Sequence, residues 1–227
     1  MKYDRIDSKL FIKNRKNFME KMKPESLAVF NSNDIYPIGA DSTMPFQQNR
    51  DIFYLSGVDQ ENSILVLFPD APEKKHREIL FLTETNEHIA IWEGAKLNKE
   101  DALKVSGIKT VYWMKDFEKV FFEVMTQCET VYLNTNEHYR ANHKTETSDD
   151  RFIKWCKEEY PAHQVAKSNP ILQRLRSVKD QIELDLMQKA CDITEKAFRR
   201  TLKFVKPGVW EYEIEAEYMH EMLRNRS

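Results

Sequence analysis

The sequence predicts an α/β fold in which a mixed β-sheet is flanked by helices. Three observations support this prediction. Short apolar runs bounded by polar or proline residues are typical of strands, and segments with apolar residues at helical spacing separate some of them. Such alternation favours a sheet that is parallel where helices cross over and antiparallel at hairpins. After Ser168-Asn169-Pro170 the pattern changes to two long amphipathic helices, which we interpret as the start of a second domain.

The composition is that of an ordinary globular protein. The chain has 227 residues, of which 41% are hydrophobic and 32% charged, which is not the composition of a disordered chain. Lys and Arg number 35 against 37 Asp and Glu, without long blocks of one sign, which argues against nucleic acid as a partner. No stretch of about 18 apolar residues is present, which argues against a membrane span. Cys128, Cys156 and Cys191 are widely spaced, as expected for reduced thiols in a cytoplasmic protein.

The first half of the chain contains the predicted sheet. A helix is expected between Asp7 or Ser8, either of which can act as N-cap, and Pro24, which ends it. Phe11, Arg15, Phe18 and Met22 lie on one stripe of this helix. Strands are predicted at 27–30, 64–68, 79–82, 110–113 and 130–133, and a helical pattern at 117–124 joins the last two. Residues 88–92 follow a polar turn and predict a hairpin with the strand at 79–82.

The second half begins with residues 134–150, which contain almost no aliphatic side chain and predict a surface loop before a helix around 152–156. We place the domain boundary at 170, which gives an amino-terminal domain at 1–170 and a second segment at 171–227. That segment predicts two helices, whose apolar stripes consist of Leu186, Ala190, Ile193, Ala197 and Thr201, and of Tyr212, Ala216, Met219 and Leu223. Because no further element can cover these stripes, we expect the chain to be a fragment of a longer protein.

The residues alone predict no catalytic site and no metal site. With five glycines, the chain has neither a phosphate-binding loop nor the Gly-x-Ser-x-Gly nucleophile motif. His220-Glu221 begins like the zinc motif His-Glu-x-x-His, but Arg224 occupies the position of the second histidine. His138 and His143 have acidic neighbours at a spacing that matches no ligand pattern, namely Glu137, Glu146, Asp149 and Asp150.

Two groups of motifs resemble a known family. The first group comprises Phe46-Gln47-Gln48, Tyr54-Leu55-Ser56-Gly57 and the turn Trp92-Glu93-Gly94. The second comprises Leu175-Arg176-Ser177-Val178-Lys179, Met187-Gln188-Lys189-Ala190, Lys206-Pro207-Gly208 and residues 211–216. In this order they are similar to the amino-terminal domain and the first catalytic-domain helices of Xaa-Pro aminopeptidases, or aminopeptidase P, which are pita-bread metallopeptidases related to prolidase and creatinase.

The resemblance implies a fold and an activity. It implies an aminopeptidase P amino-terminal domain followed by a truncated start of the α+β pita-bread domain. The full-length parent would remove an amino-terminal residue preceding proline from peptides, using two divalent ions, usually manganese. The family's metal ligands are two Asp, one His and two Glu, all of which would lie beyond Ser227. This chain would therefore hold no cofactor and be inactive alone, while shaping substrate access and homo-oligomer contacts.

Trp92, Arg50 and Tyr54 are the candidates for contact with substrate or with a neighbouring subunit. Trp92 is preferred because in similar enzymes an aromatic residue of this turn reaches toward a neighbouring active site; the alternative is that it ends a buried strand. Gln47 stands where the family often has arginine, and Arg50 follows it, which leaves the role of that arginine open. Two other functions stay open: a prolidase or creatinase, and a catalytically inactive relative that binds peptides or proteins.

Overall fold

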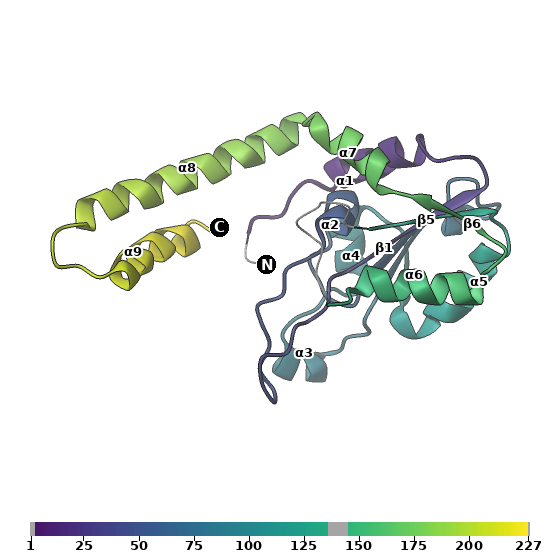
Figure 1. Cartoon of the computed structure of the whole chain (residues 1–227), viewed down its shortest axis with the longest axis horizontal. Coiled ribbons are helices and arrows are strands. Elements are labelled where there is room, and N and C mark those ends of the chain that lie inside the picture. Colours follow the sequence, from purple (N-terminus) through teal and green to yellow (C-terminus); the bar gives the residue numbers. More distant parts are fainter. Residues whose placement is uncertain (1–2, 136–144, 227) are drawn as a thin grey trace. The chain divides into compact units, whose positions relative to one another are not determined.

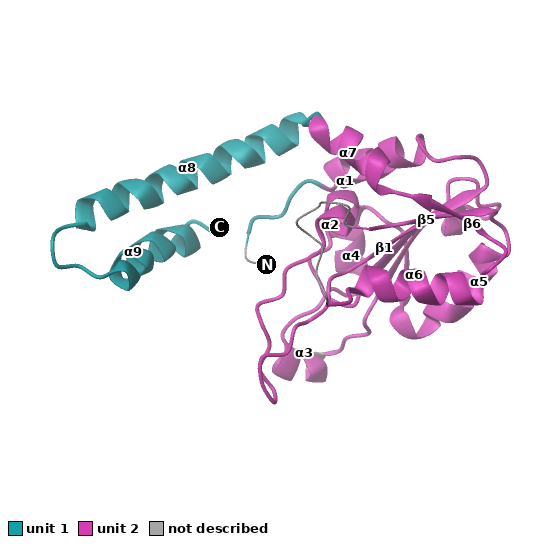
Figure 2. Ribbon diagram, in the orientation of Figure 1, with its two compact units in different colours: residues 1–7, 178–227 teal, residues 8–177 magenta. Residues whose placement is uncertain are grey.

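The computed structural model describes residues 3–135 and 145–226, so His138 and His143 lie outside the described residues. The chain forms two compact units, one of residues 8–177 and one of residues 1–7 with 178–227 (Figure 2). Leu172 of helix α7 (Asn169–Ser177) is buried in the core of the first unit, which therefore extends past the boundary predicted at 170. No helix among the described residues is long and apolar enough to cross a membrane.

The first unit is built on a six-stranded mixed sheet with the order β4-β3-β2-β1-β5-β6. Figure 1 labels β1, β5 and β6 of this sheet. Its strands are β1 (Ser26–Asn31), β2 (Ile64–Leu67), β3 (Glu78–Leu82), β4 (Thr110–Trp113), β5 (Thr130–Leu133) and β6 (Gln164–Lys167). The pairs β1–β2 and β2–β3 are antiparallel, whereas β1–β5, β5–β6 and β3–β4 are parallel. The predicted mixed sheet is confirmed, and β6 is an addition to it.

Helices cover both faces of the sheet because alternate residues of each strand point to opposite sides. In β1, Leu27 and Val29 pack with α5 (Phe117–Met125) and α6 (Ser148–Glu159). Ala28 and Phe30 pack on the other side, with residues of α1 (Ser8–Met19), α2 (Arg50–Ser56), α4 (Lys99–Ser106) and α7. Both faces are buried, which explains why these strands read as continuous apolar runs in the sequence.

The hairpin predicted at 88–92 is wrong, because this segment is the short helix α3 (Glu87–Glu93). Asn86 caps it, and its side chain accepts a hydrogen bond from the backbone N–H of Ile89 at 2.9 Å. Both edges of β3 are already paired, one with β2 and the other with β4, so no edge is free for a hairpin partner. Ile91 and Trp92 consequently lie exposed on α3, and Trp92 does not end a buried strand.

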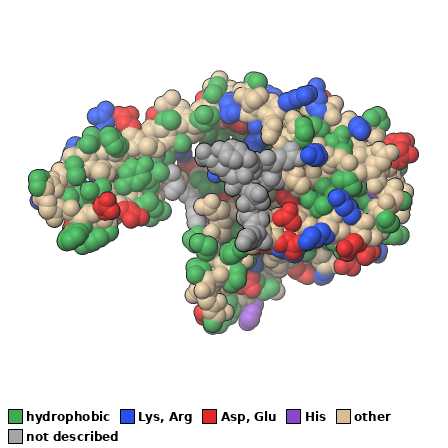
Figure 3. Space-filling model, in the orientation of Figure 1, with side chains coloured by type: hydrophobic (Ala, Val, Ile, Leu, Met, Phe, Trp, Pro, Cys, Tyr) green, Lys and Arg blue, Asp and Glu red, His purple; other side chains and the backbone are tan. Residues whose placement is uncertain are grey.

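The helices of the second unit are α8 (Gln181–Phe204) and α9 (Glu211–Arg224), and they pack against each other. The two amphipathic helices predicted for this segment are therefore present. Arg200 of α8 forms an ion pair with Glu217 of α9, with Nε and Oε2 2.6 Å apart. Within the stripe of α8, Ile193 and Ala197 are buried. Much apolar surface nevertheless remains exposed on this unit (Figure 3), including Leu186, Met187, Phe198, Leu202, Trp210, Tyr212, Met219 and Leu223.

Candidate functional site

A cluster of polar side chains lies where three parallel strands end. Asn31 is the last residue of β1, Asn134 follows β5, and Ser168 follows β6. All three are buried. Since carboxyl ends of parallel strands meet at one edge of a sheet, these residues come together although they are far apart in the chain. This edge is the usual position of binding sites in α/β proteins.

Asp149, in the first turn of α6, is at the centre of the cluster. Its Oδ1 accepts a hydrogen bond from Asn31 Nδ2 at 2.8 Å. Its Oδ2 accepts from Asn49 Nδ2 at 3.3 Å and from Asn134 Nδ2 at 3.5 Å. Burial raises the pKa of Asp149 to about 7, the hydrogen bond from Asn31 opposes this shift, and the charge of Asp51 adds to it. The carboxyl group therefore titrates near neutral pH.

Asp51 connects the cluster to α7. Its Oδ2 accepts a hydrogen bond from Asn134 Nδ2 at 3.2 Å, and its Oδ1 lies 2.6 Å from Arg176 Nη1 in an ion pair. The Arg176 guanidinium also lies over the ring of Tyr54, 5.7 Å from the ring centroid. Two motifs that the sequence presents far apart, the Tyr54 segment and the Arg176 segment, are thus in direct contact.

A groove of about 600 Å³ adjoins the cluster. Asp149 and Asn49 line it together with Asn33, Asp34, Phe46, Gln47 and Asp150. An ion pair between Asp34 and Arg151, 2.5 Å apart, lies beside it. The lining offers carboxylates, amides and two aromatic rings, those of Tyr36 and Phe46, which suits hydrogen-bonding or cationic groups better than an anion.

The described part of the groove contains no set of three metal-type ligands and no cysteine. Cys128 and Cys156 are free thiols in the core, and burial raises their pKa values to about 12 and about 11. A thiol that stays protonated at neutral pH is a poor nucleophile. The prediction that these cysteines are reduced and structural agrees with this environment.

The three predicted contact residues lie in different surroundings. Tyr54 is partly buried next to Arg176, and its carbonyl accepts a hydrogen bond from Asn14 Nδ2 at 3.0 Å. Arg50 is exposed at the first position of α2. Trp92 is 82% exposed on α3. Of the three, Tyr54 alone is connected through described contacts to the polar cluster, by way of Arg176.

Sequence reasoning missed the cluster itself. The sequence predicts a surface loop at 134–150, which includes Asp149, but α6 begins within that range, because Thr147 and Asp150 form a reciprocal capping box at its start. The Thr-x-x-Asp spacing is visible in the sequence and could have located this helix start. Asn49 is likewise a helix N-cap, and its side chain accepts from the Asp51 N–H at 2.9 Å.

Comparisons with known proteins agree with this architecture. The family model for the N-terminal domain of aminopeptidase P matches residues 11–132, and that of metallopeptidase family M24 matches residues 185–227. Xaa-Pro aminopeptidase of Escherichia coli is 24% identical over 97% of this chain, and human Xaa-Pro aminopeptidase 3 is 26% identical over 84% of it. The chain spans 50% of the length of the former and 37% of the latter.

Solved structures show the same partial coverage. A Bacillus anthracis protein assigned as an aminopeptidase P matches with a TM-score of 0.84 and 27% identity, over 96% of this chain and 51% of that protein. Aminopeptidase P of E. coli in its low-pH form matches with a TM-score of 0.82 and 23% identity, over 97% of this chain and 50% of that protein, which shows a shared fold. Because the first family model covers more than half of the chain, the chain belongs to the aminopeptidase P N-terminal domain family.

Proposed function

We propose that this chain is the amino-terminal part of a metal-dependent Xaa-Pro aminopeptidase, which removes an amino-terminal residue preceding proline from peptides. The observation that carries the proposal is the order of the two family matches. A match to the aminopeptidase P N-terminal domain at 11–132 is followed by a match to metallopeptidase family M24 at 185–227, and the similar proteins of Escherichia coli and Haemophilus influenzae are named Xaa-Pro aminopeptidases.

The proposed role of the chain within that enzyme is to shape substrate access and to build contacts between subunits of a homo-oligomer in the cytoplasm. The groove at the end of β1 and β5 supplies carboxylates and amides for a peptide. Trp92, exposed on a short helix, offers a large apolar side chain for contact with substrate or with another subunit. Arg50, exposed at the first position of α2, offers a cation for the same role.

The catalytic ions are proposed to be two divalent ions, manganese in most of the family, held outside this chain. The described residues do not fit such a pair, which needs two Asp, one His and two Glu. Their one group of metal-type side chains, Glu73, His76 and Glu123, contains no aspartate and is too small for two ions. We therefore assign no catalytic step to this chain.

The substrate test compares an Xaa-Pro tripeptide with an Xaa-Pro dipeptide. We expect the full-length protein that contains this segment to hydrolyse the tripeptide in the presence of manganese and to prefer it over the dipeptide. The 227-residue chain should release no amino acid from either. Preference for the dipeptide would indicate a prolidase, and absence of hydrolysis by the full-length protein would indicate an inactive peptide-binding relative; either result overturns the proposal.

The Trp92 assignment is tested separately by Trp92→Ala in the full-length protein. We expect about a ten-fold loss in kcat/KM, or a smaller oligomer in light scattering, because exposed tryptophans are frequent binding hot spots. Phe122→Ala is the matched control, since Phe122 is also an aromatic residue on the surface of a helix, 61% exposed. Equal activity and equal size of both variants and the unmodified protein would show that Trp92 makes no such contact.

A further inference from the structure

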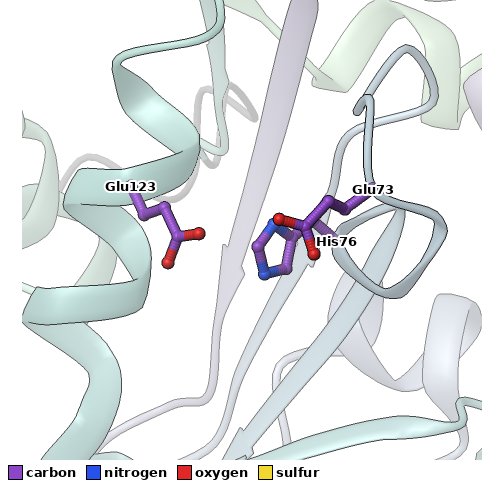
Figure 4. A group of neighbouring side chains, drawn as sticks. All are labelled: Glu73, His76 and Glu123. Atoms are coloured by element: carbon purple, nitrogen blue, oxygen red, sulfur yellow. The ribbon is translucent and has the colours of Figure 1, made fainter.

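Three side chains with metal-binding chemistry meet away from the groove. Glu73 precedes the 3-10 helix η1 (Lys74–His76) in the connection between β2 and β3, and His76 ends it. Residues three apart in a 3-10 turn lie on the same side, so Glu73 and His76 face one way. Glu123 comes from α5, and Figure 4 shows its carboxylate and that of Glu73 pointing toward the His76 imidazole.

The geometry leaves space for an ion between them. One potential ligand atom from each residue lies within 4.8 Å of the other two. His76 is 2% exposed, and its ring makes no hydrogen bond to any described residue. Its ring nitrogens are not among the buried polar atoms that lack a hydrogen-bond partner, so they keep some contact with solvent and an ion can reach them. An ion placed between the two carboxylates would be within reach of a ring nitrogen.

We propose that Glu73, His76 and Glu123 bind a divalent transition-metal ion of the zinc class. One imidazole and two carboxylates are suitable ligands for such an ion, which takes three protein ligands and a water at an open site. Bonds of about 2 Å require the ligand atoms to approach one another by roughly 1 Å. Both glutamates are exposed and have flexible side chains, so this movement leaves the core unchanged.

Lys75 is the residue that competes with the ion. Its Nζ lies 2.8 Å from Glu73 Oε2, in an ion pair whose two side chains are both more than half exposed. A metal ion would displace this ammonium group and take its place beside the carboxylates. Exposed ion pairs are weak, so the competition lowers the metal affinity without preventing binding. Removing the lysine charge should therefore strengthen binding, a result that a structural role for Glu73 does not predict.

The bound ion would join two elements that are separate in sequence. It would tie the β2–β3 connection, which carries Glu73 and His76, to α5 on the surface of the sheet unit. A ligand that binds the folded state alone stabilises it by mass action. Zinc should consequently raise the melting temperature of this chain, and above the Kd the stabilisation should grow with the logarithm of the zinc concentration.

The test is a titration of the chain with zinc chloride, in competition with a chromophoric chelator and in a Cys191→Ser background, because Cys191 is an exposed thiol. Glu73→Gln and Glu123→Gln should each raise the zinc Kd by about ten-fold or more. Even substitution of residues that only hydrogen-bond to metal ligands lowers metal affinity by about 10–100-fold. Lys75→Met should tighten it. Glu118→Gln, another exposed glutamate of α5, is the matched control and should leave it unchanged.

The two glutamate variants carry the test because a substitution at buried His76 also disturbs packing. Zinc should raise the melting temperature of the unmodified chain and of Glu118→Gln, and not that of Glu123→Gln. A further variant, His138→Gln with His143→Gln, distinguishes the histidines of the polar loop as an alternative zinc site. Loss of binding in that variant, or unchanged affinity in both Glu73→Gln and Glu123→Gln, would overturn the proposal.

Discussion

Replacing Arg15 by methionine is expected to lower the free energy of unfolding by about 3–5 kcal/mol, because it removes one partner from a buried set of charged hydrogen bonds. The Arg15 side chain is fully buried. Its Nη1 donates to the carbonyls of Leu55 and Ser106, at 2.8 Å and 2.9 Å, and its Nη2 lies 3.0 Å from Glu78 Oε2. Methionine fills much of the volume and supplies none of these donors.

The position of Arg15 explains why the loss is large. Leu55 and Ser106 lie in the last turns of α2 and α4, where helix carbonyls have no partner within the helix and carry the negative end of the dipole. Both helices then end in a glycine with positive φ, Gly57 and Gly107. One guanidinium thus neutralises two helix ends, and no water can replace it in a fully buried position.

Urea unfolding followed by tryptophan fluorescence measures this effect. Lys16→Met is the matched control: it replaces the adjacent cation of α1, whose side chain is 74% exposed, and should change stability by less than about 0.5 kcal/mol. The free energy of unfolding of Arg15→Lys should lie between those of Arg15→Met and Lys16→Met, because one ammonium group cannot reach acceptors on three elements. Equal stability of Arg15→Met and Lys16→Met would contradict the assignment.

The sequence predicted those parts of the fold whose signal is local. Strands β1, β2 and β3 are buried on both faces. Each is therefore a continuous apolar run in the sequence, whichever strands it pairs with. β6 was not predicted because only Val165 and Ala166 of its four residues are apolar and the strand is mostly exposed at the sheet edge. The apolar run at 88–92 fits a helix and a strand equally well. What decides it is the occupation of both edges of β3, a long-range property that no local pattern contains.

The polar cluster could not be predicted from the sequence, because it also depends on contacts between residues far apart in the chain. Asp51 and Arg176 are 125 positions apart, and Asn31 and Asp149 are 118 apart. Each is an ordinary polar residue near the end of a strand or helix, and the sheet order β1-β5-β6 makes them neighbours. By contrast, the family resemblance depends on local motifs, such as Tyr54-Leu55-Ser56-Gly57, and could be read directly.

The pH dependence of stability should reveal Asp149. Its pKa is about 7 in the folded protein, against an ordinary value of 3.8. Between these values the folded state holds a proton that the unfolded state has released, so the free energy of unfolding falls as pH rises. The contribution is fully present below about pH 4 and is lost as pH passes through 7. From pH 5 to pH 8 it amounts to about 2–3 kcal/mol.

Asp149→Asn should remove this part of the pH dependence. The substitution also changes hydrogen bonds with Asn49 and Asn134, but that cost is the same at every pH, so the difference in stability between pH 5 and pH 8 isolates the titration. Asp41→Asn, at an exposed position, is the control and should retain the full dependence. Urea unfolding at the two pH values provides the measurement, and carboxyl-carbon NMR should give Asp149 an apparent pKa near 7. If unmodified protein and Asp149→Asn lose stability equally between pH 5 and pH 8, the partly buried carboxyl group is ionised throughout, and its hydrogen bonds from three asparagines outweigh its desolvation.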